Sequence, residues 1–382
     1  MVYLACVLAA LLAGSLVYCV LVMVAVRRYL AVRPPPLAAH EPVSILKPLH
    51  GLDPGLEDNL RTFFTQDYPS FEILFNVRSL ADAAAGVVEK LQCEFPAVPS
   101  RLMVTGEPPY PNAKVFALEK MLEAAAYDLV VMSDSDIRVT PQLLLTIAAE
   151  FQDPHIGVAT CPYRAVAGKR LWSRLEAAGM NTEFLAGILV ARMLEGMKFA
   201  VGPTIAARRR VLHAIGGFAR LKDYLAEDFV LGKFAAGHGD GVILSSYVVE
   251  HHIGSESAAR NAAHRLRWSR STRRSRPAGY AGSIFTNPLP LALLVCAVQP
   301  HWWPLLILVL AIRFAAAHVV SADVLKAHVP WALLIVQDLL SFLFWIAGFF
   351  GNTITWRSHK YCLLADGRFE RKPPARQAEP RP

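Results

Sequence analysis

Hydrophobic residues gather at both ends of the chain and alternate with polar residues in the middle. Leu4–Val26 contains no charged residue, and a helix of about 23 residues spans about 34 Å, enough to cross a bilayer. Three further apolar blocks lie toward the other end, at Ile284–Gln299, Trp302–Val320 and Trp331–Phe350. The pattern predicts a central domain flanked by membrane helices.

The charges around the first block predict its orientation. Nothing basic precedes the block, whereas Arg27, Arg28 and Arg33 follow it, and a cleaved signal peptide would show the reverse order. By the positive-inside rule we expect a retained anchor with its N-terminus outside and the following domain in the cytoplasm. The alternative is a buried core helix.

The C-terminal blocks differ in kind. The first is short and carries Pro288 and Pro290, so it is expected to be re-entrant or interfacial rather than spanning. Arg313 and Asp338 lie inside the two longer blocks and could pair, because isolated charges at membrane depth are costly. We expect two crossings and a cytoplasmic C-terminus, since basic residues follow the last block: Arg357, Lys360, Arg368, Arg371 and Lys372.

The middle of the chain alternates strand-like and helix-like segments after a proline-rich linker. The predicted strands are "VSILKPL", "FEILFNV", "RLMVTG" and "YDLVVMS", and helical spacing follows the first three of them. Such alternation predicts an α/β fold with a mostly parallel sheet and helices on both faces. We therefore divide the chain into residues 1–28 (anchor), 29–42 (linker), 43–280 (cytosolic domain), 281–352 (membrane region) and 353–382 (basic cytosolic tail).

Composition narrows the class of partner. The chain of 382 residues is 54% hydrophobic and 18% charged, with a net charge of +8. A basic surface could serve nucleic acid, but beside membrane spans it favours anionic lipid or a phosphorylated substrate, so no nucleic acid is expected. Six scattered cysteines without a CxxC pair support neither a zinc site nor a disulfide framework.

The fourth predicted strand ends at Asp134 and Asp136. In parallel sheets ligands bind beyond the carboxyl ends of the strands, and residues two apart point the same way, about 6.5 Å apart. Two carboxylates at this distance repel by about 2.5 kcal/mol at an effective dielectric of 20. A divalent cation would offset this repulsion, and oxygen ligands suit Mg²⁺ or Mn²⁺. The alternative is a solvated turn that caps the next helix.

Two further charged features follow. Glu227 and Asp228 lie where a helix is predicted to begin. They are either a second functional acidic site or residues that only stabilise the positive end of the helix dipole. "HRLRWSRSTRRSR", His264–Arg276, offers cationic donors for a diphosphate and an aromatic platform, or is a basic juxtamembrane segment. Together with the D-x-D pair, these features indicate a metal-bound, diphosphate-containing substrate next to a membrane.

The order D-x-D, E-D and R-W before C-terminal membrane helices resembles a processive-type family 2 glycosyltransferase core. More closely, "KPLHGLDPGLEDNLRTFFTQDYPSFEILFNV", "NAKVFAL", "SDSDIRV", "AEDF" and "RLRW" are similar to the ceramide glucosyltransferase family. That family includes bacterial relatives that glycosylate hopanoid lipids. The resemblance runs from Val43 to about Leu364 and implies a GT-A-like nucleotide-sugar-binding fold.

The resemblance also implies roles on the donor side. Asp82 would contact the uridine, although "VRSLADAA" here replaces the denser acidic run of the family. Asn112 and Lys114 match an Asn-x-Lys element that lines the nucleotide site. Asp134 and Asp136 match the pair that binds the metal and the sugar diphosphate.

On the acceptor side, Asp228 matches the general base, with Glu227 beside it. Arg267 and Trp268 match the R-W that holds the diphosphate and packs near the acceptor. His264 occupies a position that is usually Gln or Arg, and a neutral His264 could donate a hydrogen bond toward the acceptor.

Two segments stay open. Leu171–Gly202 is apolar but interrupted by charges, which suits either an amphipathic helix that admits the lipid or a helix packed on the catalytic sheet. His251 and His252 look metal-like, but without further ligands at suitable spacing we expect a structural role.

The resemblance implies an inverting transferase that moves one hexose, glucose or N-acetylglucosamine, from a UDP-sugar to a hydroxyl of a membrane lipid. The acceptor would be a ceramide or a hopanoid polyol such as bacteriohopanetetrol. A multi-pass protein of the bacterial inner membrane with a cytoplasmic catalytic domain is expected. The alternatives are a processive polysaccharide synthase, which usually has more spans, and a non-catalytic lipid-binding scaffold.

Overall fold

The computed structural model describes residues 2–328, 331–356 and 359–372. The strands are β1 (Val43–Pro48), β2 (Phe71–Val77), β3 (Ser100–Val104), β4 (Leu129–Ser133), β5 (Ile137–Arg138), β6 (Ile156–Thr160), β7 (Tyr163–Val166), β8 (Thr204–Arg208), β9 (Gly241–Leu244), β10 (Val249–His252), β11 (Thr353–Trp356), β12 (His359–Leu363) and β13 (Phe369–Arg371).

The α-helices are α1 (Val2–Leu30), α2 (Leu56–Phe64), α3 (Ala83–Glu94), α4 (Ala113–Ala124), α5 (Leu143–Glu150), α6 (Leu171–Gly179), α7 (Leu185–Glu195), α8 (Arg209–Ala214), α9 (Glu227–His238), α10 (Ala258–Ser275), α11 (Pro277–Gly282), α12 (Pro288–Val298), α13 (Pro304–His318) and α14 (Trp331–Gly348). Short 3₁₀ turns are η2 (Phe218–Leu221), η3 (Ser283–Thr286) and η4 (Pro300–Trp302), and π-helical turns are η1 (Met180–Phe184) and η5 (Val319–Val324).

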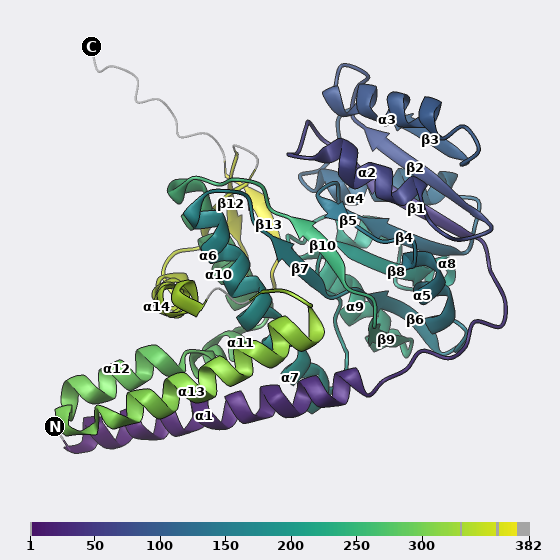
Figure 1. The fold of residues 1–382 in the computed structure, drawn as a ribbon. Helices are drawn as coiled ribbons and strands as arrows, with labels where there is room; N and C mark the ends of the chain where they lie inside the picture. The colour runs from purple at the N-terminus through teal and green to yellow at the C-terminus, as the bar shows by residue number, and fades with distance from the viewer. Residues whose placement is uncertain (1, 329–330, 357–358, 373–382) are drawn as a thin grey trace, which may run out of the picture.

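A seven-stranded sheet in the order β3-β2-β1-β4-β8-β6-β9 forms the centre of the domain. The first four of these neighbours run parallel, and β8 is antiparallel to both β4 and β6. Both faces of the sheet are covered, because Ile45 packs into the core beneath α2, α3 and α5, whereas Leu46 packs into the core beneath α4, α8 and α9 (Figure 1). Burial on both faces explains why these strands are continuous apolar runs. The predicted mostly parallel α/β fold is confirmed.

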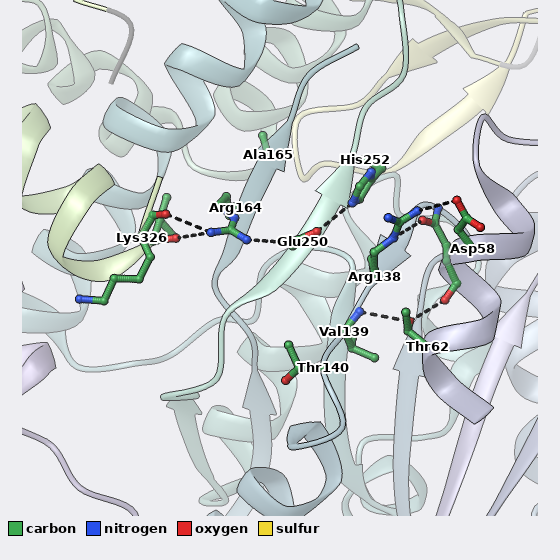
Figure 2. Close-up of polar contacts among 12 residues, drawn as sticks. Asp58, Thr62, Arg138, Val139, Thr140, Arg164, Ala165, Glu250, His252 and Lys326 are labelled. Carbon is green, nitrogen blue, oxygen red and sulfur yellow. Dashed lines mark hydrogen bonds and ion pairs between the residues drawn. The ribbon is translucent and has the colours of Figure 1, made fainter. Parts of the chain in front are cut away.

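A second, three-stranded sheet connects this domain to the membrane helices. Its order is β5-β10-β7, and β5 begins four residues after β4 ends. Figure 2 shows Arg164 of β7 paired with Glu250 of β10, which also contacts His252. The same guanidinium donates to the carbonyl of Lys326, at 3.1 Å, just beyond the π-helical turn that follows α13. Polar contacts therefore join the small sheet to the end of a membrane helix.

Three helices of the described chain are long and apolar enough to cross a membrane: Tyr3–Leu30, Pro304–Val324 and Trp331–Gly348. The earlier proline-containing block is broken, because Pro277–Thr286 and Pro288–Val298 meet at a bend of 65°. Arg313 and Asp338 form two hydrogen bonds of 2.8 Å inside the helical bundle and are almost fully buried. The predicted pairing of these two charges is confirmed.

The segment α6–η1–α7 lies between the small sheet and the membrane helices. Helix α6 packs against α14, α10 and β7, and α7 packs against α1. For Leu171–Gly202 we considered an amphipathic helix that admits the lipid and a helix packed on the catalytic sheet. Neither describes this placement in full, because the segment contacts both the central domain and the membrane helices.

Two arginines of the basic stretch on α10 bind the segment that follows α14. Arg270 donates to the Phe350 carbonyl at 3.0 Å, and Arg273 donates to the Gly351 carbonyl at 2.7 Å. These carbonyls follow the last turn of α14, where helices leave acceptors unpaired and favour cations. Much of the cluster that suggested lipid or phosphate contacts is therefore used inside the protein.

Part of the predicted basic tail is folded, which corrects its description as a tail. Strands β11, β12 and β13 form an antiparallel sheet around the buried side chains of Ile354, Tyr361, Leu363 and Phe369. The Phe369 amide donates to the Asp223 carbonyl at 2.9 Å, so this sheet is attached to the loop before α9. Arg357 and residues 373–382 lie outside the described residues.

Candidate functional site

The carboxyl end of β4 carries the acidic pair, and Lys114 from the first turn of α4 reaches it. The Lys114 ammonium lies 2.7 Å from Asp134 Oδ1 and 3.2 Å from Glu227 Oε1. Burial disfavours the ammonium, but Asp134 and Glu227 outweigh burial and raise the pKa of Lys114. One cation thus joins the D-x-D segment to the start of α9.

Asn112 fixes the position of this lysine. Its Oδ1 accepts a hydrogen bond from the Val115 amide at 3.3 Å and caps α4, while its Nδ2 donates to the Tyr224 carbonyl at 2.9 Å. The side chain is fully buried. Asn112 therefore ties the N-terminus of α4 to the segment before α9, and its effect on a ligand would pass through Lys114.

Asp136 contacts His251, a residue for which we expected a structural role. Asp136 Oδ2 lies 3.0 Å from His251 Nε2. Burial raises the carboxyl pKa and lowers the imidazole pKa, but the pairing outweighs burial, so the pKa of Asp136 is lowered and the pKa of His251 is raised. Among the described residues, Asp136 Oδ1 and His251 Nδ1 are buried without a hydrogen-bond partner. Sequence spacing could not indicate this pair, because the β5–β10 register brings it together.

Lys47 is a second residue that the sequence did not single out. It lies at the end of β1, fully buried, and its ammonium donates to the Asp134 carbonyl and lies 3.8 Å from the Phe63 ring centre. Burial lowers the pKa of Lys47 to about 7, against the opposing effect of Asp134 and Asp136. The sequence feature that could have identified Lys47 is its position as a lysine inside an otherwise apolar strand.

The acidic pair fits a divalent cation that takes part of its shell from a substrate. No group of three or more His, Cys, Asp or Glu side chains gathers around a possible ion in the described part of the chain. Mg²⁺ is commonly held by one or two carboxylates together with substrate phosphates. Asp136 Oδ1, buried and without a donor, is an oxygen that an ion would satisfy, and Asp134 is one-third exposed.

Asp228 lies at the start of α9 and is held by backbone amides. Its Oδ2 accepts from the Gly202 amide at 2.7 Å, and its Oδ1 accepts from the Phe229 amide at 2.7 Å. Burial and the neighbouring Glu227 raise the pKa of Asp228 to about 6. Gly202 has φ +80°, and a Cβ there would come within 2.7 Å of the Tyr163 ring. Only glycine suits this position without strain.

Aromatic rings connect the R-W segment to the acidic residues. Trp268 packs on Phe184 at 5.8 Å between ring centres, Phe184 packs on Tyr163 at 5.3 Å, and Tyr163 packs edge-on against His251 at 5.5 Å. We call Trp268, Phe184 and Tyr163 the aromatic wall. Arg267 precedes Trp268 on α10 and is half-buried.

His264 lies one helical turn before Trp268, with the ring centres 4.8 Å apart. Its Nδ1 lies 2.6 Å from Glu176 Oε1, and Asn261 Nδ2 donates to Glu176 Oε2 at 2.6 Å. Burial raises the Glu176 carboxyl pKa, but these two partners outweigh it and the pKa of Glu176 is lowered. The Nδ1 side of His264 is therefore committed to Glu176.

Asp82 lies in the loop after β2, the strand next to β1, and its side chain makes structural hydrogen bonds. It caps α3 by accepting from the Ala84 amide at 3.0 Å, and it accepts from the Gly51 amide at 2.9 Å. These bonds join the loops that follow β1 and β2. Lys114 links the predicted residue Asp134 to Glu227, which directly precedes Asp228, whereas the contacts of Asp82 are with its own two loops.

Comparison with known proteins points to one family. The model of glycosyl transferase family 21 matches residues 7–369. Ceramide glucosyltransferase 1 of Caenorhabditis elegans is 31% identical over 207 residues, which cover 54% of this chain and 44% of that protein. A ceramide glucosyltransferase of Komagataella phaffii is 40% identical over 103 residues, 26% of this chain and 20% of that protein. The chain thus aligns with less than half of the length of either relative.

Among solved structures, a mannosyltransferase of Pyrobaculum calidifontis in complex with GDP-mannose and Mn²⁺ has a TM-score of 0.55 and 20% identity. The match covers 91% of this chain and 97% of that one. At this identity the likeness concerns the fold alone, and it confirms the expected GT-A-like architecture.

Proposed function

The chain belongs to glycosyl transferase family 21, and on that basis we propose that it transfers a single hexose from a UDP-sugar to a hydroxyl of a membrane lipid. The observation that carries this proposal is the contact of Lys114 with both Asp134 and Glu227. Glu227 directly precedes Asp228 in the chain. The contact links the residues that we assign to the diphosphate with the segment that carries the proposed proton acceptor.

The donor would bind at the carboxyl ends of β1, β2 and β4. Asp82 would stand beside the uridine, and Lys114, with Asn112 behind it, would neutralise part of the diphosphate charge. Arg267 would approach the same diphosphate from α10. Competition between the phosphates and Asp134 for Lys114 would release the carboxylate toward a cation.

The residues that would hold Mg²⁺ or Mn²⁺ are Asp134 and Asp136, and His251 pairs with Asp136 beside them. When bound, the ion supplies positive charge that stabilises the departing diphosphate. Its requirement for oxygen ligands agrees with the two carboxylates and with the unpartnered Asp136 Oδ1.

Asp228 would act as the general base. In an inverting transfer the acceptor hydroxyl attacks the anomeric carbon from the face opposite UDP, and its proton passes to a carboxylate within hydrogen-bond reach. The Gly202 and Phe229 amides orient this carboxylate. A pKa of about 6 leaves Asp228 ionised yet basic near neutral pH. No covalent enzyme intermediate is needed.

The acceptor would enter from the membrane side, past Trp268 and the aromatic wall. We assign it to the ceramide or hopanoid polyol class and the sugar to glucose or N-acetylglucosamine. The catalytic domain would face the cytoplasm, since the basic residues at the end of α1 follow the positive-inside rule. We assign the chain to a bacterial inner membrane.

The test uses the purified full chain in lipid nanodiscs. Labelled UDP-glucose and UDP-N-acetylglucosamine are each supplied with ceramide or bacteriohopanetetrol, with Mn²⁺ or with EDTA, and lipid-borne label is measured. Transfer to one lipid, lost in EDTA and in Asp228→Asn, is expected. Label in a polymer would favour a polysaccharide synthase instead, and no transfer from either donor to either lipid would refute the proposal.

A further inference from the structure

The π-helical turn η1 places two adjacent residues in different surroundings. Met180–Phe184 interrupts the α6–α7 helix, and π-helical turns inside α-helices are often found at functional sites. Phe184 belongs to the aromatic wall, between Trp268 and Tyr163. Glu183, one residue earlier, is directed to the helices of the membrane region.

Residues from three other elements converge on Glu183. Ser341 of α14 donates to Glu183 Oε2 at 2.6 Å, and Thr286 of η3 donates to Glu183 Oε1 at 3.2 Å. Arg265 of α10 donates to Ser341 Oγ at 3.1 Å and to Gln337 Oε1 at 2.9 Å. We call these five residues the Glu183 cluster. A carboxylate beside membrane helices is costly to bury unless it is hydrogen-bonded, and ionisable residues at such positions often mark functional sites.

The cluster retains hydrogen-bonding capacity. An ionised carboxylate has about four acceptor positions, and the two hydroxyl donors occupy two of them. In the described part of the chain, the Tyr18 hydroxyl on α1 is buried without a partner. Glu183, Tyr18, Thr286 and Arg313 line one cavity of about 10 Å³, which is the space for one water-sized group.

A series of packed residues connects the residue after Glu183 to Asp228. Phe184 packs on Tyr163, whose ring lies against Gly202, and the Gly202 amide binds Asp228 at 2.7 Å. On the other side, Ser341 and Thr286 belong to the membrane region. A lipid whose chains lie among these helices, and whose hydroxyl reaches Asp228, would pass its polar group along Glu183.

We infer that Glu183 selects the lipid acceptor by accepting a hydrogen bond from a second hydroxyl next to the reacting hydroxyl. This inference rests on the proposed lipid glycosyltransferase function. Ser341 and Thr286 orient the carboxylate, and the Tyr18 hydroxyl completes the polar surface. Lipids that carry a single hydroxyl are selected against.

The test measures acceptor preference in the full chain in nanodiscs. Ceramide is compared with a ceramide that lacks the hydroxyl at carbon 3, and bacteriohopanetetrol with a hopanoid that bears only its terminal hydroxyl. A hydrogen bond to a charged group corresponds to a preference of about tenfold or more in kcat/KM. In Glu183→Gln this preference falls to less than about threefold, while the KM for the UDP-sugar stays within about twofold.

Two further variants separate recognition from folding. Glu195→Gln, on the same helical segment but paired with Arg276 at the surface, keeps the wild-type preference. Ser341→Ala keeps the Glu183 carboxylate but removes one of the donors that orient it, so the acceptor preference falls by a smaller factor. This variant also tests the proposal if Glu183→Gln does not fold.

The outcomes are distinguishable. An unchanged acceptor preference in Glu183→Gln or in Ser341→Ala, with transfer intact, overturns the role of Glu183 and leaves the proposed function standing. A wild-type chain that transfers sugar to none of the four lipids refutes the proposed function, and the acceptor role with it.

Discussion

Lys114 and Asp134 form an ion pair of 2.7 Å at the carboxyl end of the sheet, and the same ammonium lies 3.2 Å from Glu227. The cation therefore stands between the segment that we assign to the diphosphate and the segment that carries the proposed general base, Asp228. Loss of this cation should affect both donor binding and the arrangement of the two acidic segments.

We expect Lys114→Met to raise the KM for the UDP-sugar by about tenfold or more and to lower kcat, because a charge-assisted contact is removed and the carboxylates of Asp134 and Glu227 are left without the cation between them. Initial rates at varied UDP-sugar measure both constants. Lys120→Met is the matched control, because Lys120 lies on the exposed side of α4 and pairs with Glu123. Equal kinetics in the two variants would contradict the assignment.

The activity should fall on acidification because Asp228 must be ionised to accept a proton. With a pKa of about 6, about one tenth of the carboxyl is ionised at pH 5. We expect kcat/KM to rise about tenfold between pH 5 and 7 and then to level off. Asp228→Asn should lose about 10²-fold or more of the activity, as general bases do. A flat profile from pH 5 to 7 would argue against Asp228 as the base.

Metal binding can be measured without turnover. We expect Mn²⁺ to raise the thermal stability of the chain in detergent, by about 2.7 kcal/mol at one hundred times its Kd, and Asp136→Ala to abolish most of this effect. Asp58→Ala, at an exposed position that pairs with Arg138, is the control. Stabilisation by Mn²⁺ that survives in Asp136→Ala would remove this carboxylate from the metal site.

The buried Arg313–Asp338 pair offers a double-mutant test of the membrane region. Removing one partner leaves a buried charge unpaired and typically costs about 3–5 kcal/mol, whereas replacing both by apolar residues of similar size is often neutral. We expect Arg313→Met and Asp338→Leu each to unfold at a lower temperature in nanodiscs, and the double variant to recover most of the loss. Additive losses would show that the two charges act independently.

Local pattern sufficed for the elements and for some of the site. Apolar runs such as Val43–Pro48 are buried on both faces and therefore predict central strands. A helix follows each of the first three strands as predicted, and the Asp134–Asp136 pair lies at a strand end as expected. The positions of Arg313 and Asp338 inside apolar blocks predicted that they pair, because an unpaired charge at membrane depth is too costly.

Tertiary structure decided which of these groups meet. The contact of His251 with Asp136 depends on the register of β10 against β5, and residues 115 positions apart share no local pattern. The same holds for Lys114 with Glu227, for Glu176 with His264 and for Glu183 with Ser341. Hydrophobic periodicity reports which face of an element is buried, but not which other element covers it. The sequence by itself thus determined the elements, the membrane helices and the ends of the strands, and packing of distant segments decided the partners of each charged side chain.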